Sequence, residues 1–315
     1  MKTTNSVSVI VLTYNSSTTV ISTLESILKQ TFDTNDIELI ISDDASSDNT
    51  PELITEWVLI NRHKFYSVKE ICHTKNLGIV SNLDNAYREA CGEWIKIIAG
   101  DDILLPECID TFYTTALKHN GRLYLSYIQT FHETNGVIIK GELLPPESQV
   151  EVLKGELEKQ QNHLINSSFS ATPSLFIQKS LLEEVSFLDR DFFLMEDYPL
   201  WFKITEYGVK IDFVDKVTVL YRVEESVSRS KKNIINLNFL KDILKLESKI
   251  VSKIPSGTMA YRRRKIWFFS YPLIVSLFQN KRTFLSKAVV LVINVMFKPG
   301  YLNALYAKVL SKYKK

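Results

Sequence analysis

The chain has 315 residues, of which 45% are hydrophobic and 23% are charged, enough for a full globular core. This composition excludes a disordered or collagen-like chain. The charge is unevenly distributed: residues 1–247 carry a net charge of −12, whereas residues 248–315 hold fourteen Lys and Arg and no acidic residue. The sequence therefore predicts an acidic body followed by a basic C-terminal region.

Cysteine and histidine are too sparse for a disulfide framework or a zinc site. Cys72, Cys91 and Cys108 form no CxxC pair, and no histidine sits in an HxxxH or HExxH pattern. This cysteine usage is typical of a reducing compartment. The N-terminal residues pass directly into a predicted strand without an apolar leader, so we expect no signal peptide. These features predict a cytoplasmic protein.

Short apolar runs alternate with helical patterns in the first part of the chain. Strands are predicted over about seven residues from Val7, over 37–42 and over 93–100. Apolar residues at helical spacing predict helices from Val20 to Leu28, over 79–90 and over 106–119. This alternation, which continues to about residue 128, predicts an α/β fold whose mostly parallel sheet has helices on both faces.

The second part of the chain has a different pattern. An Asn135-Gly136 pair between β-rich runs predicts a hairpin. Residues 170–223 continue as strand, helix, loop, helix and strands, and the sequence past residue 229 becomes basic and helical. We expect a catalytic or binding domain over residues 1–230 and a basic helical region over residues 231–315.

Polar residues follow three of the predicted strands, at the edge where an open α/β sheet binds its ligands. Any one of the four aspartates among them is equally well explained as a helix cap or a loop residue in water. Four such carboxylates at one edge favour a binding site. These candidate residues are Thr13, Tyr14 and Asn15, then Asp43 and Asp44, then Asp101 and Asp102.

The first turn, "TYNSST", lacks the glycine patterns that bind phosphate in dehydrogenases and P-loop enzymes. A phosphate-containing ligand would then need a metal ion to neutralise it. Mg²⁺ or Mn²⁺ takes one or two carboxylates together with substrate phosphates. Asp101 and Asp102 suit this role.

Four segments, taken in order, resemble the family 2 glycosyltransferases of the GT-A fold over roughly residues 5–230. They are "VSVIVLTYN", "IELIISDDASSDNT", "NLGIVSNLDNAYREACGEWIKIIAGDDILLP" and "FFLMEDYPLWFKI". The resemblance implies a Rossmann-like mixed sheet and an inverting transfer of a sugar from a nucleotide diphosphate, most often UDP. It also implies an acceptor hydroxyl, here expected on a lipid-linked glycan in polysaccharide or O-antigen biosynthesis.

The resemblance further assigns roles to residues. It places Thr13, Tyr14, Asn15 and the Asp43-Asp44 pair at the nucleoside, with Asn76 and Asn82 nearby. Gly100-Asp101-Asp102 corresponds to the DxD motif of the family, with Asp102 as the metal ligand and Asp101 beside it. Ala99 departs from the family because many relatives have another aspartate at this position.

A second acidic pair, Glu196-Asp197, begins a predicted helix. First-turn acids are favoured there by the helix dipole alone. The resemblance identifies the pair with the ED motif of the family and assigns Asp197 as the general base that takes the proton of the acceptor hydroxyl.

Two residues after the last strand are open to more than one interpretation. Arg222 either contacts the diphosphate, as a Tyr-Arg pair does in many relatives, or is a surface cation at a strand end. Glu224 stands where relatives commonly have a histidine near the metal. It either replaces that histidine as an oxygen ligand or serves another purpose.

The basic region combines Arg262, Arg263, Arg264 and Lys265 with aromatic residues directly after them. Its apolar stretches are too short to span a bilayer. The pattern fits contact with an anionic membrane surface. It also fits a helical extension packed on the catalytic domain or on a second subunit. We expect no nucleic-acid partner because no RNA- or DNA-binding module is visible.

Two rival functions are distinguishable in principle. A nucleotidyltransferase of the same fold would need a glycine- and lysine-bearing N-terminal loop, which "TYNSST" lacks. A non-catalytic protein that binds sugar nucleotides at the membrane would bind UDP and lose nothing when Asp197 is replaced by asparagine.

Overall fold

The computed structural model describes residues 7–134, 136–223, 233–298 and 301. The chain separates into two compact units. The first comprises Met1–Leu164 and Ser168–Glu224, and the second comprises Ile165–Ser167 and Glu225–Lys315. The boundary predicted at residues 230 and 231 lies outside the described residues.

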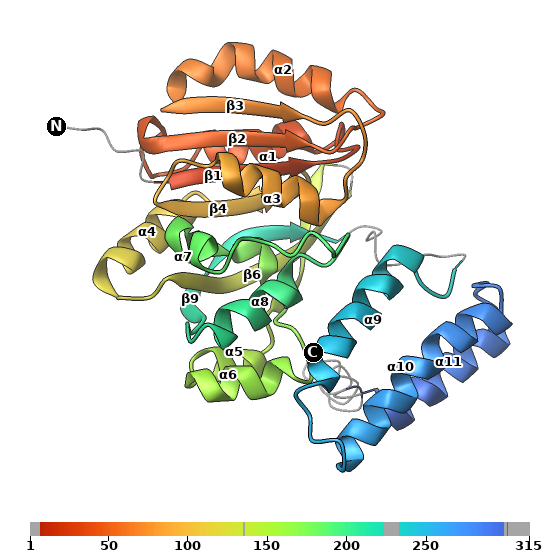
Figure 1. The fold of residues 1–315 in the computed structure, drawn as a ribbon. Helices are drawn as coiled ribbons and strands as arrows, with labels where there is room; N and C mark the ends of the chain where they lie inside the picture. The colour runs from red at the N-terminus through yellow and green to blue at the C-terminus, as the bar shows by residue number, and fades with distance from the viewer. Residues whose placement is uncertain (1–6, 135, 224–232, 299–300, 302–315) are drawn as a thin grey trace. The chain divides into compact units, whose positions relative to one another are not determined.

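A mixed sheet is the centre of the first unit (Figure 1), and among the described residues it has nine strands. Their order is β3-β2-β1-β4-β8-β6-β9-β5, and β7 pairs with β6. Strands β1 to β4 are parallel to one another, whereas β8 is antiparallel to both of its neighbours, β4 and β6. The strands are β1 (Val7–Thr13), β2 (Ile37–Asp43), β3 (Ser67–Cys72), β4 (Trp94–Ala99), β5 (Ile103–Leu104), β6 (Leu123–Thr134), β7 (Val137–Leu144), β8 (Phe176–Gln178) and β9 (Asp212–Arg222).

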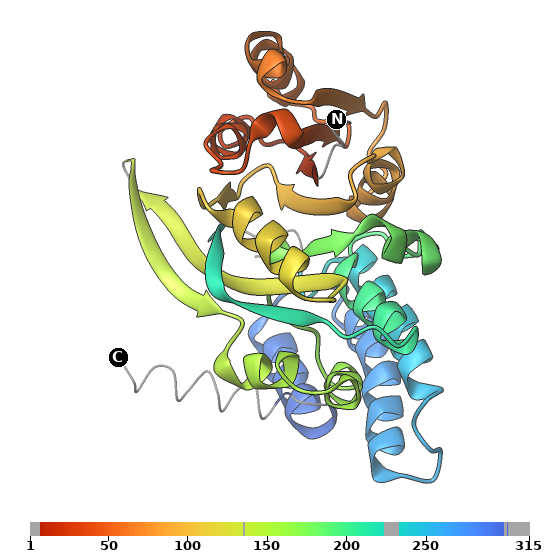
Figure 2. The ribbon, with the colours of Figure 1, turned by 90° about the vertical axis from the view of Figure 1, so that its left-hand side faces the viewer.

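Helices cover both faces of this sheet, as the alternating pattern predicts. Helices α1, α2 and α4 contribute to one core cluster with β1 and β2, while α3 packs on β1 and β2 from the other side (Figure 2). The helices of the first unit are α1 (Val20–Leu28), α2 (Thr50–Asn61), α3 (Ile79–Glu89), α4 (Cys108–Lys118), α5 (Glu147–Leu153), α6 (Leu157–Leu164), α7 (Lys179–Glu184) and α8 (Asp197–Glu206). A short 3₁₀ turn, η3 (Thr172–Ser174), precedes β8.

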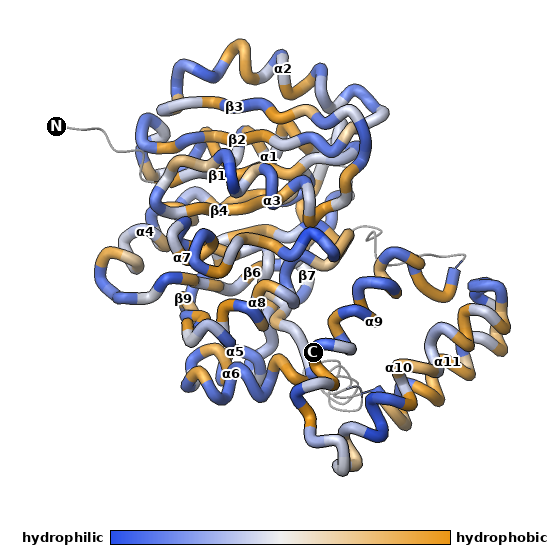
Figure 3. The backbone as a smooth tube through the Cα atoms, viewed as in Figure 1, coloured by the Kyte–Doolittle hydropathy of each residue, from blue (hydrophilic) through white to orange (hydrophobic). Residues whose placement is uncertain are grey.

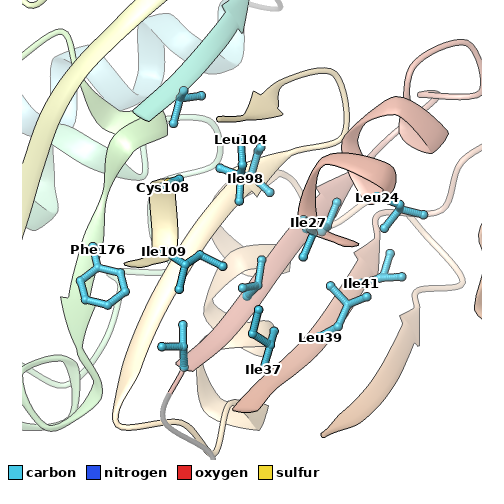
Figure 4. Close-up of a cluster of buried hydrophobic side chains, with 14 of the residues drawn as sticks. Leu24, Ile27, Ile37, Leu39, Ile41, Ile98, Leu104, Cys108, Ile109 and Phe176 are labelled. Atoms are coloured by element: carbon cyan, nitrogen blue, oxygen red, sulfur yellow. The ribbon is translucent and has the colours of Figure 1, made fainter. Parts of the chain in front are cut away.

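The core forms because β-branched and leucine side chains of the central strands meet the apolar stripes of the helices. Val7, Val9 and Val11 alternate along β1 into one cluster, which Leu24 and Ile27 of α1 cover. The close-up in Figure 4 shows this layer continuing across β4 to Ile98, Leu104 and Phe176. Burial of this kind is the dominant favourable contribution to the free energy of folding.

Strand β3 is not predicted from the sequence. Strand β3 is the edge strand next to β2 and has the sequence "SVKEIC", with no residue in the fully buried class. Three of its six side chains are polar, and as an edge strand it is only partly buried, so it shows neither an apolar run nor clear alternation. The hairpin predicted at Asn135-Gly136 is confirmed by the antiparallel pair β6 and β7, although Asn135 itself lies outside the described residues.

The described part of the second unit is helical, as predicted. Its helices are α9 (Leu237–Val251), α10 (Met259–Leu277) and α11 (Phe284–Phe297). Arg264 of α10 forms a buried ion pair with Glu247 of α9, with Nε and Oε2 2.8 Å apart. Trp267 of α10 donates from Nε1 to Asn294 Oδ1 of α11 at 3.1 Å. Within the described residues, no helix is both long enough and apolar enough to cross a bilayer.

Candidate active site

The carboxyl ends of β1, β2 and β4 meet at one edge of the sheet, as the sequence predicts. Thr13 is in register with Asp43, and Leu12 is in register with Ala99. The Thr13 hydroxyl donates to Asp43 Oδ2 at 2.8 Å. Gly100 is packed so tightly against Thr13 that a Cβ there would lie 2.8 Å from Thr13 Cγ2. The three predicted strand ends are therefore adjacent in the structure.

Asp43 and Asp44 are both buried, and each carboxylate organises a loop. Asp43 accepts from the backbone amide of Ser46 at 2.8 Å and from its hydroxyl at 2.6 Å. Asp44 accepts from the amides of Leu77 and Gly78 at 2.7 and 2.9 Å. The pair thus holds the loops that follow β2 and β3 against the edge of the sheet.

The neighbouring candidates also lie at this edge. Asn15, with a left-handed φ of 52°, accepts at Oδ1 from the Ser47 amide at 2.8 Å. Asn76 donates from Nδ2 to the Asp44 carbonyl at 3.3 Å. Tyr14 is half exposed. Asn82 differs, because its buried amide group bonds only to Ser42 of β2 among the described residues. We therefore assign Asn82 to the core rather than to the ligand edge.

Asp102 is the most unusual carboxylate of the site. It is 1% exposed, and its Oδ1 accepts from the backbone amide of Arg222 at 2.8 Å. Its Oδ2 is buried and has no hydrogen-bond partner in the described part of the chain. Burial, and then the charge of neighbouring Asp101, raise the pKa of Asp102 well above its usual range. Such an oxygen is costly to leave unpaired, so it fits a site that receives a cation.

A metal ion at this position would have few protein ligands. No group of three or more His, Cys, Asp or Glu side chains gathers with metal-binding geometry in the described residues. Asp101 and Asp102 can supply one or two oxygens, which suits a hard divalent ion that takes its other ligands from substrate phosphates and water. Glu224, the third predicted ligand, lies outside the described residues.

Arg222 is buried, so it is not the surface cation of the alternative interpretation. Its side chain is 4% exposed, and its guanidinium carbon lies over the Phe131 ring, 4.6 Å from the centroid. Its Nε donates to the Asp101 carbonyl at 2.9 Å, and its Nη1 lies 3.1 Å from Glu133 Oε2. The end of strand β9 thereby places a fixed positive charge and a backbone N–H donor next to Asp101 and Asp102.

The second acidic pair begins α8, as predicted. Asp197 Oδ2 accepts from the hydroxyls of Thr172 and Ser168 at 3.1 and 3.3 Å. Burial raises the pKa of Asp197, although hydrogen bonds from the Tyr198 amide and these hydroxyls oppose the shift. A first-turn acid in water would show no such increase. Asp197 is therefore a carboxylate whose environment brings its pKa closer to neutral, as proton transfer requires.

The segment before this pair lies against the loop that Asp44 holds. Val80 donates from its amide to the Phe193 carbonyl at 3.4 Å. Gly78 has φ +83°, and a Cβ there would lie 2.7 Å from the Phe193 carbonyl oxygen and its ring. The chain leading to Glu196 is thus fixed next to the loop beyond β3. Thr172 and Ser168 have no local sequence signal, because they come from a loop that meets Asp197 only in the folded chain.

The comparisons with known proteins agree with this fold. The model of glycosyl transferase family 2 matches residues 8–186. The match ends before Asp197 and Arg222, so it does not cover these two candidates. A crystal structure of Staphylococcus aureus TarS residues 1–349 in complex with UDP-GlcNAc aligns with a TM-score of 0.61 at 20% identity. It covers 84% of this chain and 71% of that chain, and at this identity it shows the GT-A fold alone.

Two curated relatives are similar over most of their length. An Escherichia coli enzyme, UDP-Glc:alpha-D-GlcNAc-diphosphoundecaprenol beta-1,3-glucosyltransferase WfaP, is 29% identical over 75% of this chain and 86% of its own. Glycosyltransferase GlyG of Streptococcus pneumoniae is 27% identical over 78% of this chain and 79% of its own. The matched family model, these relatives and the sheet topology agree. The chain is a glycosyltransferase and belongs to glycosyl transferase family 2.

Proposed function

We propose that this glycosyltransferase moves a sugar, with inversion, from a UDP-sugar to a hydroxyl of a lipid-linked glycan. The observation that carries this proposal is the buried Asp102 Oδ2 without a partner, at the edge where β1, β2 and β4 end. The name of the Escherichia coli relative, which specifies UDP-glucose and a diphosphoundecaprenol acceptor, supports both substrate classes.

The nucleoside would lie against the first two strand ends. Thr13 and Asp43 are joined by a hydrogen bond, and their remaining oxygen lone pairs can accept from the base or the ribose. Asp44, Asn15 and Asn76 would act through the loops that they hold. Half-exposed Tyr14 can offer its ring as a stacking surface.

The diphosphate would lie at the acidic pair. Asp102, with Asp101, would hold Mn²⁺ or Mg²⁺, and the bound ion supplies positive charge that stabilises the departing diphosphate. Arg222 adds a fixed charge next to this pair through its bond to the Asp101 carbonyl. Glu224 would serve as a further oxygen ligand.

The acceptor would lie at Asp197. Its carboxylate takes the proton of the attacking hydroxyl while the new bond to the anomeric carbon forms. The bond between that carbon and the diphosphate oxygen breaks on the opposite face, so UDP leaves and the configuration inverts. Thr172 and Ser168 orient the carboxylate through Oδ2, and Glu196 is the residue directly before α8.

We also propose that the second unit binds an anionic membrane surface. Ile266, Phe269, Leu273 and Leu277 recur at helical spacing along α10 and are 45%, 63%, 59% and 70% exposed. The tube in Figure 3 shows a hydrophilic stretch near the start of α10 and hydrophobic stretches in the rest of α10 and in α11. Exposed Arg262 continues this stripe, and no acidic residue follows Glu247. An apolar stripe beside uncompensated positive charge fits lipids with anionic headgroups.

The enzymatic proposal is tested by following UDP release and sugar transfer from a panel of UDP-sugars to a lipid-linked N-acetylglucosamine acceptor. Transfer from one sugar should need Mn²⁺ or Mg²⁺, stop with EDTA and be lost in Asp102→Ala. The exposed Asp110, one helix further along the chain, gives the matched control Asp110→Ala, which should keep full activity. UDP binding without transfer, unchanged in Asp197→Asn, would instead indicate a non-catalytic binding protein.

The membrane proposal is tested by co-sedimentation with vesicles of phosphatidylcholine with or without phosphatidylglycerol. Binding should require phosphatidylglycerol and should weaken at high salt because surface charges are screened. The double variant Phe269→Ser/Leu273→Ser should lose binding. The control Leu59→Ser/Ile60→Ser replaces two equally exposed apolar residues of α2 and should bind like the unchanged protein. Equal loss in both variants, or a dimer that covers α10, would contradict the proposal.

A further inference from the structure

A lysine is fully buried in the middle of the central sheet. Lys96 lies in β4, in register with Val9 of β1 and Phe176 of β8, and has no exposed surface. Burial lowers its pKa to about 8, while the nearby Cys108 and Asp102 oppose this shift. Removing an ammonium group from water costs several kcal/mol unless its hydrogen bonds are replaced. A strand residue at such a position is normally apolar, so Lys96 needs an explanation.

The ammonium group of Lys96 is held by backbone carbonyls rather than by a carboxylate. Its Nζ donates to the carbonyl of Ile97 and to the carbonyl of Pro173, each at 2.6 Å. Ile97 is the next residue of the same strand, whereas Pro173 lies 77 residues further along the chain, in the turn η3. Lys96 therefore ties β4 to this turn by a charge-assisted hydrogen bond, which is stronger than a neutral one.

The same turn holds the proposed catalytic base. Thr172, the residue before Pro173, donates its hydroxyl to Asp197 Oδ2 at 3.1 Å. The turn is fixed on its other side by Ser174, whose hydroxyl oxygen accepts from the backbone amide of Ser126 in β6 at 2.9 Å. Lys96 thus bonds to Pro173, and the hydroxyl of the adjacent residue, Thr172, bonds to Asp197.

Strand β4 also carries the acidic pair. Asp101 and Asp102 follow its last residue, Ala99, after a single glycine. The positive charge of Lys96 lies close enough to oppose the increase in the pKa of Asp102 that burial and Asp101 cause. Lys96 is therefore linked both to β4, whose end would bind the metal ion and the diphosphate, and to the turn Thr172–Ser174, which would orient Asp197.

We infer that Lys96 is a positioning residue that fixes the turn Thr172–Ser174, and through it Asp197, relative to the end of β4 and its acidic pair. This inference rests on the proposed function, because it assigns Asp197 to the acceptor and Asp102 to the donor. Transfer requires that the two ends be held in one geometry, since displacements near 1 Å can cost about a hundredfold in rate.

The main test compares Lys96→Met with Gln160→Met. Gln160 is equally buried and also donates to two carbonyls, those of Leu153 and Ile211, but its bonds lead to no candidate site residue. Both variants should lower the melting temperature. Only Lys96→Met should lower kcat, by about tenfold to a hundredfold, while KM for the UDP-sugar, measured at saturating Mn²⁺, changes by less than about threefold. Equal kcat in both variants, or a loss confined to the donor KM, would overturn the inference.

A double-mutant cycle tests the route through the turn. Thr172→Val removes the hydroxyl that donates to Asp197 and keeps the shape of the side chain. If Lys96 acts through Thr172, this change should lower kcat clearly in the unchanged protein and only slightly in Lys96→Met. Additive effects on kcat would mean that Lys96 and Thr172 act independently, and the inference would fail.

A measurement without catalysis separates this inference from the proposed function. Amide hydrogen exchange of Ser174 and Leu175, whose amides bond to Ala171 and Thr172, reports the opening of the turn. Exchange should accelerate in Lys96→Met and stay unchanged in Gln160→Met. Lys96→Gln, which keeps a donor without the charge, replaces the methionine variant if that variant does not fold. If the unchanged enzyme transfers no sugar, exchange at the turn still decides the role of Lys96. Unchanged exchange rejects it.

Discussion

The backbone amide of Arg222, the last residue of β9, donates to Asp102 Oδ1 at 2.8 Å and leaves the buried Oδ2 free of any partner among the described residues. The two residues are 120 positions apart in the chain. One oxygen of Asp102 is thus fixed by the sheet, and the other is left available for a ligand. Leaving Oδ2 buried and unpaired costs free energy, and a bound cation would remove this cost.

We therefore predict that Asp102→Asn stabilises the protein in the absence of divalent ions. Because the pKa of Asp102 is raised in the folded state, the folded protein holds this proton more tightly than the unfolded chain. Stability then decreases as the pH rises through the window between the two pKa values. The variant should gain about 1 kcal/mol at about pH 8 and nothing at about pH 2, where the carboxyl is protonated in both states.

Thermal unfolding in EDTA across this pH range checks the prediction. A gain that is the same at both pH values would show that the carboxylate charge is not its source. Asp110→Asn, at an exposed position of α4, is the control and should leave the melting temperature unchanged at every pH.

Replacing the proposed base should separate chemistry from donor binding. Asp197→Asn should reduce kcat by about a hundredfold to ten-thousandfold, the usual contribution of general base catalysis, with little change in KM for the donor. Because burial raises the pKa of Asp197, the acid limb of kcat/KM in the unchanged enzyme should lie above the usual pKa of an aspartate. Activity is then lost as the pH falls through this raised value. Initial rates measured against pH test both points, and an acid limb at the ordinary aspartate value would reject the assignment.

Gly100 should tolerate no side chain while Thr13 keeps its methyl group. An added Cβ would lie 2.8 Å from Thr13 Cγ2, well inside van der Waals contact. Gly100→Ala should therefore destabilise the protein by about 1–3 kcal/mol and weaken UDP binding. The double variant Gly100→Ala/Thr13→Ser removes that methyl group and keeps the hydroxyl that bonds to Asp43. It should recover part of the lost stability, measured by thermal unfolding, and part of the lost UDP binding, measured by calorimetric titration. No recovery would mean that the clash with the Thr13 methyl group is not the cause of these losses.

Arg222 and its ion-pair partner Glu133 should differ in importance. Arg222→Met removes a buried donor to the Asp101 carbonyl and the positive charge that opposes the increased pKa of Asp102. The variant should need more Mn²⁺ for half-maximal activity and should lose about 1–3 kcal/mol of stability. Glu133→Gln should change stability by less than about 1 kcal/mol, since Glu133 is 43% exposed. Titration of the initial rate with Mn²⁺ measures the first effect, and equal behaviour of the two variants would contradict it.

Much of the fold is predictable because its local signals agree with its tertiary structure. The apolar runs of β1, β2 and β4 are buried on both faces, and the stripes of α1 and α3 face the sheet as their spacing predicts. Edge strand β3 shows the limit of this approach, since a strand that is only partly buried has no strong pattern. Buried Asn82 shows another limit, because a polar side chain in the core looks like a candidate ligand until its partner Ser42 is known.

The sequence by itself determined the α/β class, the strand ends that carry Thr13, Asp43 and Asp102, and the helical basic region, because each depends on residues close together in the chain. Only the tertiary structure decided that Arg222 returns to Asp102, that Thr172 orients Asp197 and that Lys96 fixes the turn between them. These contacts join segments that are 25 to 120 residues apart. Their partners are chosen by sheet pairing and burial, and neither can be read from the spacing of residues along one segment.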